Sequence, residues 1–328
     1  MVELYACIGA EFKNITHCCK SISISGSVNE ISRKLSATFI KANWNNNIGK
    51  VDIDVGTYVY AYLDNKEIFR GITVDRSING QEEMSITCFD YCFYLKKSKV
   101  THNFRNTTAE TGTREILQEL GVSAGDIAYT GIAINRLIAE KSGYDAIMEL
   151  YSQVYKQTGR KFYVVMDCNK VCVRELSQWC NGQIVVGKNV INFDFKDSMQ
   201  DMVNRVKIFD DKNNYIATVQ DENMMNDYGI LQEIYKKEKD KDYYVVANQM
   251  LKGKTRELTA EILGDYNCRT GYAIPVTVDM LQLERETMYI TSDSHTWDIA
   301  TGNYTTSLNL LWENNMDVKD TEEQKEEK

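Results

Sequence analysis

Hydrophobic and polar residues alternate along the first hundred residues, which is the pattern of β-strands with one buried face. The segments SISISGS at 21–27 and KLSATFI at 34–40 alternate in this way, and 57–75 predicts two strands around a turn at Asp64–Lys66. A further hairpin is predicted at Asn79–Gly80, because this dipeptide favours the tight turn between antiparallel strands. Five or six short strands with tight connections indicate a small barrel or sandwich.

The pattern changes to a helical period after Lys99. Apolar side chains three and four residues apart predict one helix within 107–122 and a second from about 143 to 157, which Gly159 ends. The segments on either side of Cys168–Lys170 alternate again and predict a hairpin. This middle region is therefore expected to be an α+β unit.

Alternation returns from about Asp194 and continues to Trp312. A charge run followed by a predicted helix interrupts it at 228–257. The segments that follow Gly56 and Gly271 share one order of strand, turn, strand, polar loop and strand. This faint repeat favours two similar barrels, the second of which is divided by an insert.

The composition is that of an ordinary soluble globular protein, with 43% hydrophobic and 26% charged residues among 328. No apolar run approaches the roughly 20 residues that span a bilayer, and the N-terminus lacks the features of a signal peptide. We therefore expect synthesis in the cytoplasm and no membrane partner. The net charge of -9 provides no basic surface for holding nucleic acid.

The cysteines indicate reduced thiols, because there are nine of them, an odd number, scattered along a long chain. Cys88/Cys92 and Cys168/Cys172 have CxxxC spacing within predicted strands. They lack the CxxC knuckles or nearby histidines of a zinc site, which favours small buried side chains.

His295 stands between Asp293 and Trp297, in a chain that has only two other histidines. The stretch 289–312 alternates, turns at DIATGN and alternates again, which predicts a hairpin. The other histidines lie far along the chain, with no HxH or HExxH pattern, so neither a metal site nor a catalytic histidine is indicated. A structural histidine, hydrogen-bonded to a loop carbonyl or a side chain, is the favoured interpretation.

Paired carboxylates could still serve a glycosidase, but the sequence singles out no pair. The candidates are Asp90, Asp194, Asp197, Asp265 and Asp293, which occupy predicted strands or turns. There is no GxSxG motif, and LKGKT at 251–255 lacks the first glycine of a phosphate-binding loop. We predict no catalytic residue, no cofactor and no metal site, and hence no enzyme.

Several phrases in a fixed order resemble the baseplate hub proteins of contractile phage tails. They include SGSVNEISRKLSATF, IFRGITVD, CFDYCFYLKKS, NRVKIFD, AEILGDYNCRTGY and YITSDSHTW. The chain is most similar to the hubs of PBSX-type prophages, and more distantly to the Mu-type late-control protein D and the hub portion of type VI secretion spikes. The resemblance covers roughly residues 15–313.

The resemblance implies an α+β, mainly β fold with two similar tube-like antiparallel β-barrels. On this pattern the first barrel spans 1–98 and an α+β middle domain spans 99–195. The second barrel spans 196–313 and contains a helical insert at 228–257. Residues 314–328 carry acids and lysines without apolar partners and are expected to form a disordered tail.

The function implied by the resemblance is structural. A homotrimer with two barrels per subunit would adapt a sixfold tail tube to a threefold central spike and nucleate baseplate assembly. The implied partners are the tail tube protein, the spike, the wedge proteins and the tape-measure protein, with DNA passing through without specific binding. The particle would be a virion or an R-type bacteriocin.

The residues within these phrases have structural or interface roles on this interpretation. Gly71 and Gly264 are expected in backbone turns and Asp265 in a turn or cap, Asn204 and Arg205 at a strand edge or interface, and His295 as a loop anchor. Two alternatives stay open: a tail-associated peptidoglycan hydrolase, and a secretion-system or bacteriocin component with the same structural role.

Overall fold

The computed structural model describes residues 1–9, 11–40, 51–80, 82–176, 178–238, 242–314 and 316–319. The chain divides into two compact units, Met1–Phe193 with Thr259–Lys328, and Asp194–Leu258. Strands dominate both units, so the predicted mainly β class with helices is confirmed.

The N-terminal strands form one half of a large sheet in the order β3-β4-β7-β6-β5-β1-β2. Neighbouring strands in this half are antiparallel, and alternate side chains of β3, β4 and β7 are buried, as the sequence pattern predicts, whereas β2 is exposed throughout. The hairpins predicted at Asp64–Lys66 and Asn79–Gly80 are confirmed. The strands are β1 Val2–Ile8, β2 Glu11–Asn14, β3 Cys19–Ser27, β4 Glu30–Ile40, β5 Tyr58–Leu63, β6 Lys66–Ile78 and β7 Glu83–Asp90, with a 3-10 turn at Thr16–Cys18.

The C-terminal strands form the other half of the same sheet in the order β14-β18-β21-β20, and β20 also pairs with β19, which pairs with β13. The hairpin predicted for 289–312 is confirmed as β20 and β21. The strands are β13 Ile184–Val185, β14 Val190–Ser198, β18 Thr255–Leu263, β19 Ala273–Val278, β20 Leu283–Asp298 and β21 Tyr304–Leu311, with a 3-10 turn at Asp279–Leu281.

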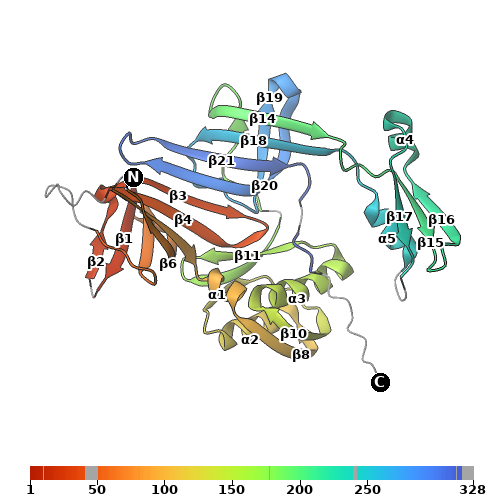
Figure 1. Ribbon diagram of the computed structural model, residues 1–328, viewed down its shortest axis with the longest axis horizontal. Helices are drawn as coiled ribbons and strands as arrows, with labels where there is room; N and C mark the ends of the chain where they lie inside the picture. The colour runs from red at the N-terminus through yellow and green to blue at the C-terminus, as the bar shows by residue number, and fades with distance from the viewer. Residues whose placement is uncertain are drawn as a thin grey trace. The chain divides into compact units, whose positions relative to one another are not determined.

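The long strand β20 joins the two halves. Its beginning pairs with β19, from Leu283 to Tyr289. Its end, from Ser292 to Asp298, pairs with β3 instead. Figure 1 shows the red strands β3 and β4 beside the blue strands β20 and β21. Within the described residues no sheet closes on itself, so the two predicted barrels are not confirmed.

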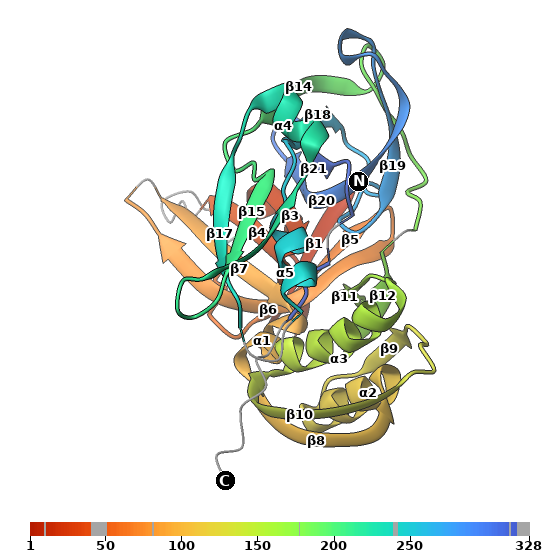
Figure 2. The ribbon, with the colours of Figure 1, turned by 90° about the vertical axis from the view of Figure 1, so that its right-hand side faces the viewer.

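The middle of the chain forms the predicted α+β region. Here β8 pairs with β10, the order β11-β12-β9 makes a second sheet, and α3 contacts strands of both (Figure 2). Both predicted helices and the hairpin at Cys168–Lys170 are confirmed. The elements are α1 Cys92–Lys97, β8 Lys99–Thr108, α2 Ala109–Glu119, β9 Ala124–Ile127, β10 Ala133–Ser142, α3 Gly143–Thr158, β11 Phe162–Asp167 and β12 Lys170–Glu175.

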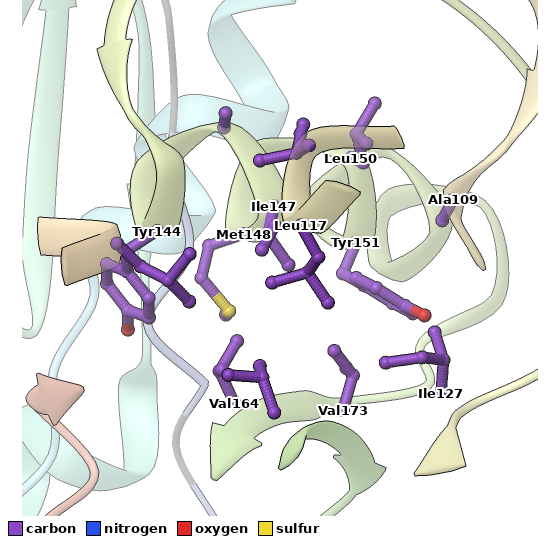
Figure 3. Packing of buried hydrophobic residues seen from close by; sticks show 14 of the residues in the cluster. Ala109, Leu117, Ile127, Tyr144, Ile147, Met148, Leu150, Tyr151, Val164 and Val173 are labelled. Carbon is purple, nitrogen blue, oxygen red and sulfur yellow. The ribbon is translucent and has the colours of Figure 1, made fainter. Parts of the chain in front are cut away.

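The core of this region lies along α3. The helix begins after Ser142, whose hydroxyl accepts a hydrogen bond from Asp145 N, and ends at Gly159, whose left-handed φ of 73° suits glycine. Figure 3 shows Met148 and Tyr151 pointing toward strand residues such as Val173. Burial of this apolar face stabilises the helix, because isolated helices of this length are marginal in water.

The second compact unit holds the three-stranded sheet β16-β15-β17, with β15 in the centre. Its small core combines Val206, Ile208, Tyr235 and Ala247. The unit begins at Asp194, whereas the sequence placed 196–227 in a barrel and only 228–257 in an insert. The alternation of β15 and β16 predicted strands but could not tell which sheet they join. The elements are β15 Arg205–Phe209, β16 Tyr215–Gln220, α4 Glu222–Tyr228, β17 Gln232–Lys236 and α5 Tyr243–Met250.

The segment after β21 contacts the middle region. Met316 packs against the core around α3, and Asp317 accepts a hydrogen bond from Tyr144 Oη at 2.8 Å. Lys319 N donates to Ser152 Oγ at 3.0 Å. These residues were predicted to belong to a disordered tail because of their charges, but an apolar side chain and a buried tyrosine give them partners. The rest of that predicted tail, 320–328, lies outside the described residues.

Candidate functional site

The structure brings three of the six candidate residues together, Gly264, Asp265 and His295. They meet where the loop between β18 and β19 lies against the β20–β21 hairpin. Asn204 and Arg205 lie in the 194–258 unit, and Gly71 lies in β6. The predicted set is therefore not one site.

His295 lies on β20 between Ile24 of β3 and Thr306 of β21, and it is fully buried. Its Nδ1 lies 3.0 Å from Thr306 Oγ1 and 3.1 Å from Tyr304 Oη. Burial lowers the pKa of the imidazole, although the nearby carboxylate of Asp293 opposes this. His295 is thus shielded from water and hydrogen-bonded to side chains, and its structural role stays a prediction.

Asp293 is the centre of a buried ionic group that the sequence did not reveal. Arg33 Nη1 and Nη2 donate to its two carboxylate oxygens at 3.0 Å and 2.5 Å. Thr270 donates to Oδ1 from both its backbone N and its hydroxyl, each at 2.7 Å. His295 Nε2 lies 3.2 Å from Oδ2, within ion-pair distance but outside hydrogen-bond geometry.

Burial and neighbouring charges shift the pKa values of the two buried aspartates in opposite directions. Burial alone would raise the pKa of Asp293, but the Arg33 guanidinium holds it well below its usual range. Asp90 accepts hydrogen bonds from the backbone N of Arg33 and of Cys92, each at 3.0 Å. Burial raises the pKa of Asp90 to about 7, although these hydrogen bonds and the charge of Arg33 oppose the rise.

Asp90 and Asp293, two of the candidates for catalytic acids, both accept hydrogen bonds from Arg33. Asp90 binds its backbone and Asp293 its side chain. Both carboxylates are buried, at 2% exposure each, so the pair cannot reach a polymeric substrate. No alternation or spacing in the sequence distinguishes Arg33 from an exposed strand residue. The ion pair of Arg33 can be recognised only from the structure, because it depends on the positions of both β4 and β20.

An aromatic layer covers the histidine. The Trp297 and Tyr304 rings stack with centroids 4.6 Å apart, and the Tyr266 ring lies 4.7 Å from that of His295. A Cβ on Gly264 would lie 2.0 Å from Tyr304 Cδ1, so glycine is required by close approach. Tyr266 Oη also donates to Ile68 O at 2.9 Å. The β18–β19 loop is therefore fastened to both halves of the sheet.

A groove of about 750 Å³ opens over this layer. It is lined by the N-terminus, the β5–β6 turn, the β18–β19 loop and the β20–β21 turn, and both aromatic and polar side chains face it. Within the described residues no cluster of histidine, cysteine or carboxylate groups could hold a metal ion. The groove thus offers a recess that could receive a polypeptide or a small molecule.

The remaining candidates have local structural contacts. Gly71 lies in β6, where a Cβ would meet Phe89 O at 2.2 Å, so the expected turn is replaced by a close strand approach. The Asn204 side chain donates to Gly229 O at 2.7 Å and accepts from Leu231 N at 2.8 Å. Arg205 begins the central strand β15 rather than an edge. Interface roles for these residues remain predictions.

Asp265 occupies the predicted turn. Its carboxylate accepts from Asn267 N at 2.9 Å, and its backbone N donates to Thr306 Oγ1 at 3.1 Å.

None of the helices in the described parts of the chain combines the length and hydropathy needed to cross a membrane.

The comparisons with known proteins place this architecture in a family. A family model described as YQBQ-like matches residues 22–311. The protein XkdQ of the phage-like element PBSX of Bacillus subtilis (strain 168) is 25% identical over 237 residues, which make up 71% of this chain and 71% of that protein. The match covers most of both chains.

Solved structures share the fold. The 43 kDa tail protein of prophage MuSo2 from Shewanella oneidensis aligns over 94% of this chain and 98% of its own, with a TM-score of 0.71 and 14% identity. The E. coli c3393 protein, a component of the type VI secretion system with structural similarity to the T4 tail proteins gp27 and gp5, aligns over 90% of this chain and 74% of its own, with a TM-score of 0.54 and 10% identity.

The sequence resemblance to PBSX-type tail proteins is thereby confirmed, and it spans both halves of the sheet and the middle region. The chain belongs to the YQBQ-like family and is a phage baseplate-related protein.

Proposed function

We propose that this protein is a baseplate hub, which as a trimer adapts a sixfold tail tube to a threefold central spike. The observation that carries the proposal is that one chain supplies two β halves joined through β20. Three such chains would present six β units in a ring, which matches a sixfold tube on one side and a threefold spike on the other.

The edges of the sheet support assembly with further copies. Among the described residues β2 and β14 end the strand order, so each pairs on one side only. Unpaired edges are templates for pairing and are usually covered in stable proteins. In a ring, neighbouring subunits would cover these edges and complete the two barrels that the resemblance implies.

The proposed partners follow from this position in a tail. The tube protein would contact one end of the ring, the spike the other, and the wedge and tape-measure proteins its outside and lumen. The net charge of -9 supports a channel that DNA passes without binding to its wall. The protein would be made in the host cytoplasm, incorporated in the virion tail or a bacteriocin particle, and would catalyse no reaction.

Light scattering over a concentration series, alone and with the tube and spike proteins, tests the proposal. We expect three times the chain mass, or a monomer that forms threefold complexes when its partners are added. Ile191→Lys on β14 should weaken the assembly, because lysine on an edge strand opposes pairing. Met280→Lys, at an exposed turn residue, is the matched control and should assemble normally.

A monomer at every concentration that binds neither the tube nor the spike would contradict the hub. The same preparations should be assayed for clearing of cell walls. Lysis by the purified protein would support the hydrolase alternative instead.

A further inference from the structure

Two buried cysteines from distant parts of the sequence lie side by side. Cys180 follows β12, and Cys268 lies in the β18–β19 loop, 88 residues later. Their sulfur atoms are 3.8 Å apart. Both are free thiols.

The backbone holds both cysteines in place. Cys180 N donates to Ala273 O at 2.8 Å, and Ala273 N donates to Gln178 O at 2.8 Å, on either side of a bridge at Trp179. Cys268 N donates to Asp265 O at 3.2 Å in the turn. The first two bonds attach the Cys180 segment to the start of β19, and the third holds Cys268 in its own turn, so the fold makes the two thiols neighbours.

The space around the sulfurs permits a closer approach. A Cβ at Gly182 would lie 3.3 Å from Cys180 Sγ and 3.4 Å from Cys268 Sγ, so the glycine leaves room beside the pair. A disulfide requires about 2 Å between the sulfurs. Closing the remaining distance requires the two cysteine side chains to rotate toward each other.

The two thiols differ in accessibility and acidity. Cys180 is 8% exposed, whereas Cys268 is fully buried. The hydrogen bond between the sulfurs lowers the pKa of Cys180, while the same bond, with burial, raises the pKa of Cys268. An oxidant would therefore meet Cys180 first. Within the described residues no third ligand completes a metal site here.

We propose that Cys180 and Cys268 form a disulfide when the protein meets a small-molecule disulfide such as oxidised glutathione. The Cys180 thiolate attacks one glutathione sulfur, forms a mixed disulfide and releases one glutathione thiolate. Cys268, on losing its proton, then attacks Cys180 Sγ and displaces the second glutathione. Overall, two protein thiols are oxidised, one glutathione disulfide is reduced to two thiols, and the two protons pass to the glutathiones.

The bond would fasten the β18–β19 loop to the segment after β12. That loop carries Asp265 and Tyr266, which line the groove, so the modification would fix one wall of the groove. Closing a loop of this length restricts the unfolded chain, which should raise the unfolding temperature by roughly 5–10 °C.

Thiol counting on the folded full-length protein tests the proposal. After incubation with oxidised glutathione, the protein is unfolded, alkylated and weighed, and its peptides are mapped. We expect a cross-linked peptide containing Cys180 and Cys268, whether or not the exposed Cys168 carries glutathione, and full recovery of the nine thiols with a reductant. Nine alkylated thiols, or a bond between other cysteines, would overturn it, as would a fall in the unfolding temperature on oxidation.

Variants test the order of the two steps. Cys268→Ser should retain glutathione on Cys180, because no second thiol displaces it, whereas Cys180→Ser should remain unmodified at Cys268. Cys88→Ser is the matched control, since Cys88 is buried beside Thr73 elsewhere in the sheet, and it should form the bond as the wild type does. If a serine variant does not fold, the wild-type peptide map still decides the proposal.

Discussion

Arg33 and Asp293 are 260 residues apart in the sequence and form a buried two-pronged ion pair. Arg33 belongs to β4 in the N-terminal half of the sheet, and Asp293 to β20 in the C-terminal half. Since β3 lies between β4 and β20, the ion pair reaches across β3 and connects the two halves of the sheet. It therefore stabilises the junction between the two halves.

Asp293→Asn should strongly destabilise the protein. The substitution leaves the Arg33 guanidinium buried without its counter-charge, which typically costs about 3–5 kcal/mol. Urea unfolding followed by tryptophan fluorescence measures the loss. Asp197→Asn is the control, because its partially exposed pair with Lys254 should contribute less than about 1 kcal/mol. Equal effects of the two substitutions would contradict the assigned role of Asp293.

Stability should depend on pH through Asp90. Its folded pKa of about 7 lies above its ordinary value of 3.8, so the folded state binds the proton more tightly. The contribution of Asp90 is therefore fully present below pH 3.8 and is lost as the pH rises through 7. The wild-type stability relative to Asp90→Asn should fall by up to about 1.4 kcal/mol per pH unit within this window.

Urea unfolding of both proteins over a pH series checks this difference. Above pH 7 the difference should be constant. Below pH 3.8 both proteins should lose stability, because the depressed pKa of Asp293 makes its contribution disappear as the pH falls. Parallel curves between pH 4 and 7 would show that Asp90 is not a buried titrating group.

Gly264→Ala should disturb the aromatic layer beneath the groove. The added methyl would overlap the Tyr304 ring, and overpacking of this kind typically costs about 1–3 kcal/mol. Calorimetry and near-ultraviolet circular dichroism would register the change in stability and in aromatic packing. Gly80→Ala provides the control, since no atom lies within 4 Å of the added carbon. An unchanged aromatic spectrum in Gly264→Ala would exclude the predicted overlap.

Asn204→Ala should loosen the 194–258 unit selectively. The buried amide satisfies Gly229 O and Leu231 N, and leaving such groups without a partner costs about 1–3 kcal/mol. Hydrogen exchange should accelerate in β15 and β17 but stay unchanged in β20. Arg205→Ala, which removes a solvent-facing contact with Gln220, should have a small effect. Faster exchange in β20 would mean that the two units unfold together.

Local structure could be predicted where short-range chemistry determines it. The helix that begins at Ser142 and ends at Gly159 and the turn at Asp64–Lys66 are determined by caps, turn residues and periodicity. The partners of the strands could not be predicted in this way. Nothing within 205–220 tells that β15 and β16 pair with β17 rather than with the large sheet.

The candidate site likewise contains one residue that the sequence singled out and one that it did not. His295 was found because histidine is rare in this chain, and its hydrogen bonds to side chains agree with the role expected. Arg33 was missed because it occupies a strand position where a long charged side chain is usually solvated. Its burial depends on a carboxylate supplied 260 residues later, which no local pattern encodes.

The double pairing of β20 restricts how the sequence can change in length. A strand that keeps register with β3, β19 and β21 cannot gain or lose one residue without turning His295 and Trp297 outward. The register shift between Ile290 and Ser292 is the place where a change of one residue could be absorbed. We therefore expect insertions and deletions among family members to be absent from 293–298 and to occur at 290–292 or in the turn at 299–303.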